Sequence, residues 1–174
     1  YVCDWFDARV GGHSTRDRGM TGAIYRIAPK GAKLKVPKFD LSKTEGQIAA
    51  LKNPSPNVRE LGRAPLEAAG SKAISAVKAL LKDTNPFIQA RAIWLLAKLG
   101  PKGIAEVEKT LKHKDPQMRL TAFRALRHEK HNTLEHAATL SKDNSPLVRR
   151  EVALALRYVP FDKSRDLLLE IADG

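Results

Sequence analysis

Four prolines recur at a fixed interval of 30 residues, and this interval constrains the fold of the chain more than any other feature. They are Pro56, Pro86, Pro116 and Pro146. The residue before each is a serine, asparagine or aspartate, the types that most often cap the N-terminus of a helix. Proline is favoured at the first helical position, because the amide hydrogen that it lacks would have no partner there. Each proline therefore predicts the start of a helix.

Apolar residues accompany every proline at helical spacing. A leucine stands ten residues after each one, at Leu66, Leu96, Leu126 and Leu156. A second apolar series precedes the prolines, at Ile74, Ile104 and Leu134 and then at Leu51, Leu81 and Leu111. The unit is thus a pair of helices joined by a short turn. One such pair cannot bury its own apolar face, so neighbouring units must stack to form a continuous core.

The sequence therefore predicts a mainly α fold, an α-solenoid of about four 30-residue helical pairs over residues 44–174. Residues 161–172 are expected to form the first helix of a fifth unit. Gly62 and Pro65 interrupt the first proline-initiated helix, which we expect to be short or kinked. Trp94 is flanked by apolar residues and is expected in the core or half-buried.

The N-terminal part of the chain has a different character. The segments YVCDWFD and GAIYRIAP are rich in β-branched and aromatic residues and predict a β-hairpin over residues 1–30. A lysine- and proline-bearing linker follows at residues 31–43. Because two strands alone are marginal in water, we expect the hairpin to belong to a larger sheet and the chain to be a piece of a longer protein.

Composition bounds the function only loosely. The chain carries 31 basic and 19 acidic residues, a net charge of +12, which is compatible with nucleic acid, anionic lipid or an acidic partner. No run of 18 apolar residues predicts a membrane span. Cys3 is the single cysteine, so neither an internal disulfide nor a CxxCH haem motif is present.

The 30-residue repeat resembles HEAT repeats, including the short PBS-lyase-like variety, over about three quarters of the chain. Such repeats serve many roles and indicate a fold more than a function. The stretch DWFDARVGGH, then Asp17, then GAIYRIAP resembles the last β-propeller hairpin of quinoprotein-type sugar dehydrogenases, in particular the planctomycete "membrane-bound dehydrogenase" proteins.

The second resemblance implies a larger parent protein. In that family a propeller precedes HEAT repeats and often a cytochrome c domain. The parent would oxidise a sugar or alcohol, with PQQ and haem c as its cofactors, in a periplasmic or other extracytoplasmic location. This segment itself is expected to hold no cofactor and no catalytic residue.

Three groups of residues are candidates for a site. His13, with Asp4 or Asp17, lies in the propeller-like hairpin, where it could line a ligand site or fix the loop by hydrogen bonds. A basic face is predicted from Arg59, Arg91, Arg119, Arg149 and Arg150. It could grip duplex DNA by charge, or its arginines could bond to an acid or carbonyl of an adjacent repeat, with Asp83 and Asp143 as acceptors.

The third group holds His128, Glu129, His131, Glu135 and His136 between two predicted helices. Histidine and glutamate are metal ligands, and HEAT-like hydroxylases hold iron with repeated His-Glu pairs. Only His128-Glu129 forms such a pair here, so a solvated turn and no metal site are expected.

These observations favour a non-catalytic scaffold that binds a protein or spaces neighbouring domains of a quinoprotein-type dehydrogenase. A basic solenoid that binds duplex nucleic acid is the alternative, and an enzyme built on HEAT repeats is a third hypothesis.

Overall fold

The structure is a computed structural model that describes residues 2–4, 22–33, 35 and 38–173. The chain divides into two compact units, residues 1–38 and residues 39–174. Each unit is described by itself below.

The first unit contains a small two-stranded antiparallel sheet. Strand β1 (Val2–Asp4) pairs with β2 (Ala23–Tyr25), and Cys3 lies opposite Ile24. The side chains of Val2, Ile24 and Tyr25 are exposed. The two segments that predicted strands therefore do pair, and their apolar side chains have little cover within the described residues.

The second unit consists of consecutive helices. Each of the four prolines starts one, as predicted: α2 (Pro56–Ala69), α4 (Pro86–Lys98), α6 (Pro116–His128) and α8 (Pro146–Leu156). The remaining helices are α1 (Thr44–Lys52), α3 (Ile74–Ala79), α5 (Pro101–Thr110), α7 (Thr133–Leu140) and α9 (Phe161–Asp173). Short 3₁₀ helices, η1 (Gly70–Ala73) and η2 (Leu80–Lys82), flank α3.

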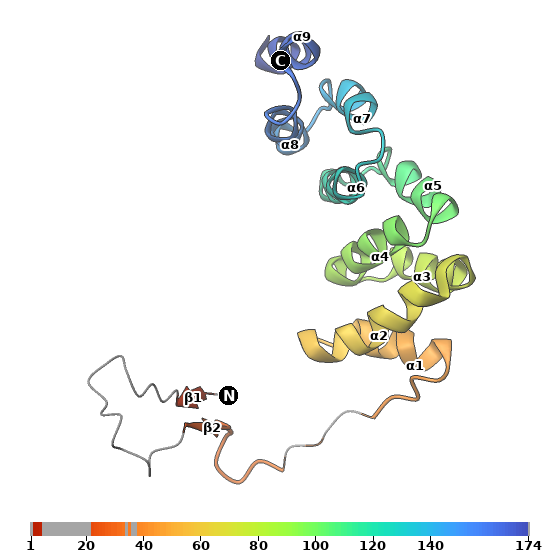
Figure 1. Cartoon of the computed structure of the whole chain (residues 1–174), viewed down its shortest axis with the longest axis vertical. Coiled ribbons are helices and arrows are strands. Elements are labelled where there is room, and N and C mark those ends of the chain that lie inside the picture. The colour runs from red at the N-terminus through yellow and green to blue at the C-terminus, as the bar shows by residue number, and fades with distance from the viewer. Residues whose placement is uncertain (1, 5–21, 34, 36–37, 174) are drawn as a thin grey trace. The chain divides into compact units, whose positions relative to one another are not determined.

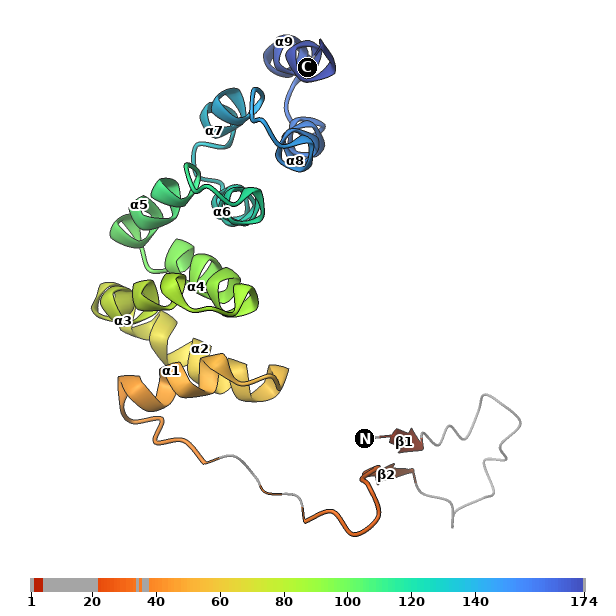
Figure 2. The ribbon, with the colours of Figure 1, turned by 180° about the vertical axis from the view of Figure 1, so that it is seen from behind.

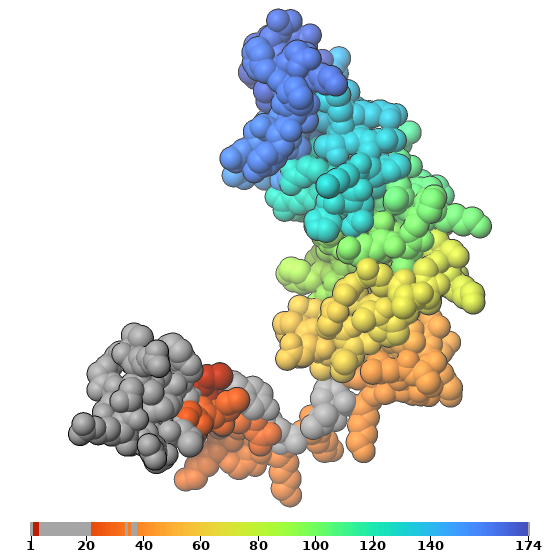
Figure 3. Space-filling view, viewed as in Figure 1, coloured from red at the N-terminus to blue at the C-terminus, as the bar shows by residue number. Residues whose placement is uncertain are grey.

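The helices of the second unit form two layers (Figure 1). One layer contains α2, α4, α6 and α8, each packed on the next, and the other contains α1, α3, α5 and α7. The view from behind shows the same arrangement (Figure 2). On the face seen in the space-filling view, successive helical pairs of the second unit lie in contact with one another (Figure 3). The second unit is therefore a HEAT-like solenoid in which helices contact mainly their immediate neighbours.

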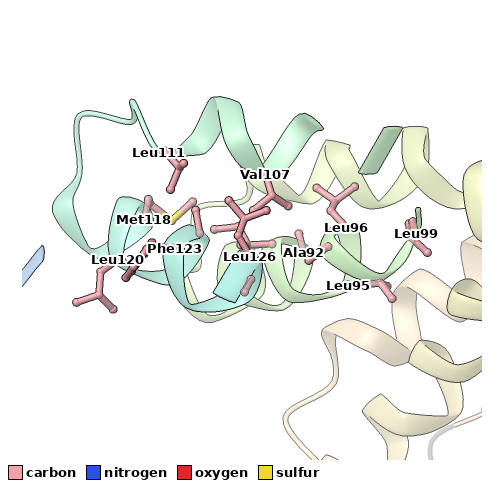
Figure 4. Packing of buried hydrophobic residues seen from close by; sticks show 14 of the residues in the cluster. Ala92, Leu95, Leu96, Leu99, Val107, Leu111, Met118, Leu120, Phe123 and Leu126 are labelled. Carbon is pink, nitrogen blue, oxygen red and sulfur yellow. The ribbon is translucent and has the colours of Figure 1, made fainter. Parts of the chain in front are cut away.

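The periodic leucines form the centre of the core. Leu66, Leu96 and Leu126 are fully buried, and Leu156 is almost so. Side chains of α4, α5 and α6 meet in one continuous apolar cluster, which joins two successive repeats (Figure 4). Burial of a leucine contributes roughly 1.5–3 kcal/mol, so these four repeated leucines stabilise the core of the solenoid.

Helix α2 was expected to be short or kinked at Gly62 and Pro65, and the structure shows that it is not short. It runs through both residues for 14 residues. Gly62 is buried against α1, and a Cβ atom there would lie 2.3 Å from the backbone oxygen of Gln47. The glycine therefore permits close packing of α1 on α2.

The apolar series of the other layer is interrupted in α7. Ile74 and Ile104 pack against the core, whereas Leu134 is 36% exposed. Lys130 and Asn132 both have positive φ angles, and the turn that they form delays the start of α7. His136 and Ala137 are buried in this helix instead.

Within the described residues, no helix combines the length and apolar character needed to cross a membrane.

Substitution of Gly62 by alanine tests the close packing of α1 and α2. Helix propensity alone favours alanine by about 1 kcal/mol, but we expect Gly62→Ala to lower the free energy of unfolding by about 1–3 kcal/mol, because the added methyl group collides with the backbone of α1. The measurement is urea denaturation. Ala64→Gly, at an exposed position of the same helix, gives the propensity baseline, and a stabilised Gly62→Ala protein would contradict the packing.

Candidate functional site

The turns before the four proline-initiated helices share one hydrogen-bond pattern. The side chain two residues before each N-cap accepts a hydrogen bond from the N-cap amide at 2.8–3.1 Å, with Asn53, Asp83, His113 and Asp143 as acceptors. Asn85 and Asp115 also cap their helices, by accepting from the amides of Phe87 and Gln117. Ser55 and Ser145 make no such side-chain cap. All four turns therefore share the side-chain acceptor two residues before the N-cap, whereas only two of them have a side-chain cap.

The predicted basic series makes contacts within these turns. Arg59, Arg119 and Arg149 each donate from Nη1 to a backbone carbonyl oxygen of the preceding turn, at 2.6–2.8 Å. Gln89, which interrupts the series, makes the equivalent bond to the Asp83 carbonyl at 2.7 Å. An uncharged side chain serves equally well at this position, so its common role is to donate a hydrogen bond.

Arg119 also joins two repeats. Its Nε and Nη2 atoms both donate to the Asp143 carboxylate at 2.7 Å, and both side chains are largely buried. The Arg119 guanidinium and the Ser145 amide hold the pKa of Asp143 below its ordinary value, against the opposing effect of burial. The Arg119–Asp143 ion pair therefore connects neighbouring repeats. Asp143 is one of the two aspartates that the sequence predicted as acceptors for the arginines. The other acceptor, Asp83, pairs with Lys52 at 2.8 Å.

Arg91 donates hydrogen bonds to backbone carbonyls at the C-terminal end of α1. Its Nη1 atom lies 3.1 Å from the carbonyl oxygens of Leu51 and Lys52 and 3.3 Å from that of Asn53. Burial, and then the nearby Arg59 guanidinium, lower the pKa of Arg91. Arg150, the last predicted member of the basic face, is exposed on α8.

Two further arginines meet a buried carboxylate. Glu151 of α8 is 4% exposed and lies 2.5 Å from Arg124 and 3.1 Å from Arg127 of α6. The hydrogen bond to Glu151 raises the pKa of Arg124. These arginines therefore contribute to packing of α6 on α8, and part of their charge is neutralised there.

An open groove of about 630 Å³ lies between α2 and α4. We call it the α2/α4 groove; its lining includes Arg59, Arg63, Phe87, Arg91, Trp94 and Lys98, with Glu60 as the acidic side chain. Phe87 is 72% exposed. Trp94 is 36% exposed, so it lines the groove instead of filling the core, and its ring packs edge-on against His128.

The charges of this groove are unevenly balanced. Arg63 pairs with Glu60 and Glu67, and Lys98 pairs with Glu129. In the part of the chain that the structure describes, the hydrogen bonds of Arg59 and Arg91 go to backbone carbonyls and not to carboxylates. The groove thus combines exposed aromatic rings with two arginines, Arg59 and Arg91, that form no ion pair with a carboxylate among the described residues.

The histidine cluster divides into two parts. His128 contacts Glu129, as the sequence neighbours suggested. His131 and His136 instead face Glu108 of α5, with Nε2–Oε1 distances of 3.0 Å and 3.5 Å. Glu108 was absent from the predicted group, since it is 23 residues from His131 and no sequence pattern connects them.

Of the three candidates in the first unit, the structure describes the backbone of Asp4. Asp4 belongs to β1. His13 and Asp17 lie outside the described residues, so their predicted role stays a prediction.

Replacement of Asp143 tests the contact between repeats. Asp143→Asn retains an acceptor for the Ser145 amide, as Asn53 does in the first repeat, but loses the ion pair. We expect a loss of about 2 kcal/mol in the free energy of unfolding at pH 7, typical of a hydrogen bond to a charged group. The folded-state pKa of Asp143 is lowered, so its contribution is present above the unfolded pKa and lost as pH falls through the folded pKa.

The difference between wild type and Asp143→Asn in urea denaturation should therefore shrink below about pH 4. Asp83→Asn is the matched control and should cost less, because Lys52 is 43% exposed. A difference independent of pH would contradict this assignment.

A family model of known proteins matches part of the second unit. Residues 74–139 match the family model of HEAT repeats. The chain is similar to the crystal structure of an engineered protein from the Northeast Structural Genomics Consortium, with 20% sequence identity and a TM-score of 0.38, over 74% of this chain and 68% of that one. No curated protein matches. Residues 74–139 are thus a HEAT-repeat segment within a HEAT-like solenoid.

Proposed function

We propose that the second unit is a non-catalytic protein-interaction scaffold whose α2/α4 groove binds an acidic segment of a partner protein. The observation that carries this proposal is the pairing of exposed Phe87 and Trp94 with the unneutralised charges of Arg59 and Arg91. HEAT repeats generally act as such scaffolds, and the matched residues 74–139 include both aromatic side chains.

The composition of the groove supports a protein partner. Tryptophan and arginine are enriched among the residues that dominate binding energy at protein interfaces. The aromatic rings provide apolar anchoring area, and the arginines favour carboxylates. The groove is also held in shape, because Arg91 is fixed to the end of α1 and Arg59 to its own turn. Binding would therefore cost little reorganisation.

Duplex nucleic acid remains the alternative ligand for the basic face. Recognition by charge requires arginines and lysines that are free to reach successive phosphates. The bonds of Arg119 to Asp143, and of Arg124 and Arg127 to Glu151, direct those side chains into contacts between repeats. This arrangement favours the protein-binding proposal over the alternative.

We further propose that the segment belongs to a larger quinoprotein-type sugar or alcohol dehydrogenase. Catalysis, PQQ and haem c would reside elsewhere in that parent, in a periplasmic or other extracytoplasmic location. The exposed apolar side chains of β1 and β2 support a setting in a larger sheet. Reading the gene on both sides of this segment is the direct check: propeller strands encoded upstream would support the proposal, and a different upstream domain would remove it.

Binding of a fluorescent acidic peptide, in which glutamates alternate with leucine and phenylalanine, tests the groove. We expect measurable binding that Trp94→Ala and Phe87→Ala each weaken by roughly fivefold or more, the change that loss of about 1 kcal/mol of contact produces. Tyr158→Ala removes an aromatic ring outside the groove that is about as exposed as Phe87, and it serves as the control.

Two outcomes would contradict the proposal. One is a peptide affinity that neither groove variant changes. The other is an affinity for duplex DNA that exceeds the affinity for the peptide and falls as the salt concentration rises. That result would favour the nucleic-acid alternative.

A further inference from the structure

Three potential metal ligands converge where α5 meets the start of α7. Glu108 belongs to the last turn of α5, His131 to the turn after α6, and His136 to α7. One ligand atom from each lies within 4.8 Å of the others. The three side chains come from two successive helical pairs, so they join neighbouring repeats.

The buried nitrogen of His136 is the observation that points to a ligand. His136 is 9% exposed, and its Nε2 atom has no hydrogen-bond partner. It faces Glu108 Oε1 at 3.5 Å, without the geometry of a hydrogen bond. A buried polar atom without a partner costs about 1–3 kcal/mol, so such an atom calls for an explanation.

The spacing of the three atoms fits a tetrahedral ion. Zinc bonds of about 2.0–2.1 Å to nitrogen and oxygen place neighbouring ligand atoms about 3.3 Å apart in tetrahedral geometry. The observed distances from Glu108 Oε1 are 3.0 Å to His131 Nε2 and 3.5 Å to His136 Nε2, on either side of this value. The ligand atoms of the two imidazoles lie within 4.8 Å of each other.

The chemistry of the ligands selects the class of ion. Two imidazoles with one carboxylate suit zinc and similar first-row divalent ions, whereas calcium and magnesium prefer oxygen ligands alone. A metal binds imidazole through a nitrogen that carries no proton. In the described residues the Nε2 atom of His136 has no hydrogen-bond partner that an ion would have to displace.

We propose that Glu108, His131 and His136 bind one zinc-like divalent ion that links two neighbouring repeats, with solvent at the fourth position. The sequence indicated no metal site because it offered one adjacent His-Glu pair, and the proposed site uses a glutamate from another helix. An ion that binds the folded chain stabilises it in proportion to the logarithm of ion concentration over Kd. The proposed role is therefore to fix the contact between α5 and α7.

The test uses the tag-free chain after treatment with a chelator. Titration with zinc chloride in a calorimeter should show one ion bound per chain, and zinc should raise the melting temperature. Glu108→Gln and His131→Ala should each weaken zinc binding by more than about tenfold, because loss of a direct ligand exceeds the usual effect of outer-shell changes. Both side chains are about one-third exposed, so these variants should fold, which circular dichroism verifies.

His128→Ala is the matched control, since this exposed histidine contacts Glu129 and not Glu108. It should leave zinc affinity and the melting shift unchanged. Three results would overturn the proposal: no zinc binding by the wild-type chain, equal affinity in Glu108→Gln and His131→Ala, or loss of binding in His128→Ala.

Discussion

Contact between successive repeats is the constraint on which the rest of the structure depends. A single pair of helices leaves an apolar face uncovered, and only the next pair can cover it. Leu66, Leu96 and Leu126 are fully buried because neighbouring helices pack over them. The 30-residue interval follows from this requirement, since each unit must present the same surface to the next. Polar contacts such as Arg119–Asp143 add to the same contact surface between repeats.

Much of the second unit could be predicted because its signals are local. Proline after a capping residue favours the start of a helix, and all four starts predicted from the 30-residue interval were confirmed. The features that were missed depend on packing between helices. Gly62 weakens a helix by propensity, but here it lets α1 approach α2. The exposure of Leu134 and Trp94 likewise reflects turn geometry and the position of neighbouring helices.

The candidate sites show the same division between local and non-local signals. The arginine series was visible in the sequence, but its structural role was not. Gln89 makes the same hydrogen bond to a turn carbonyl without a charge, which shows that the four residues share hydrogen-bond donation. Glu108 could not be associated with His131 and His136, because their proximity arises from the stacking of α5 beside α7. Repeated residues therefore serve mainly the fold. Among the features proposed to bind ligands, Arg59 belongs to the repeated series, whereas Phe87, Trp94 and the Glu108 cluster do not repeat.

Hydrogen–deuterium exchange across residues 39–173 tests the stacking account most directly. Helices with neighbours on both sides should open least often, since each repeat is stabilised by those it contacts. The account predicts the slowest amide exchange in α4, α5 and α6, with protection decreasing toward α1 and toward α9. Protection of α1 and α9 equal to that of α6 would contradict it.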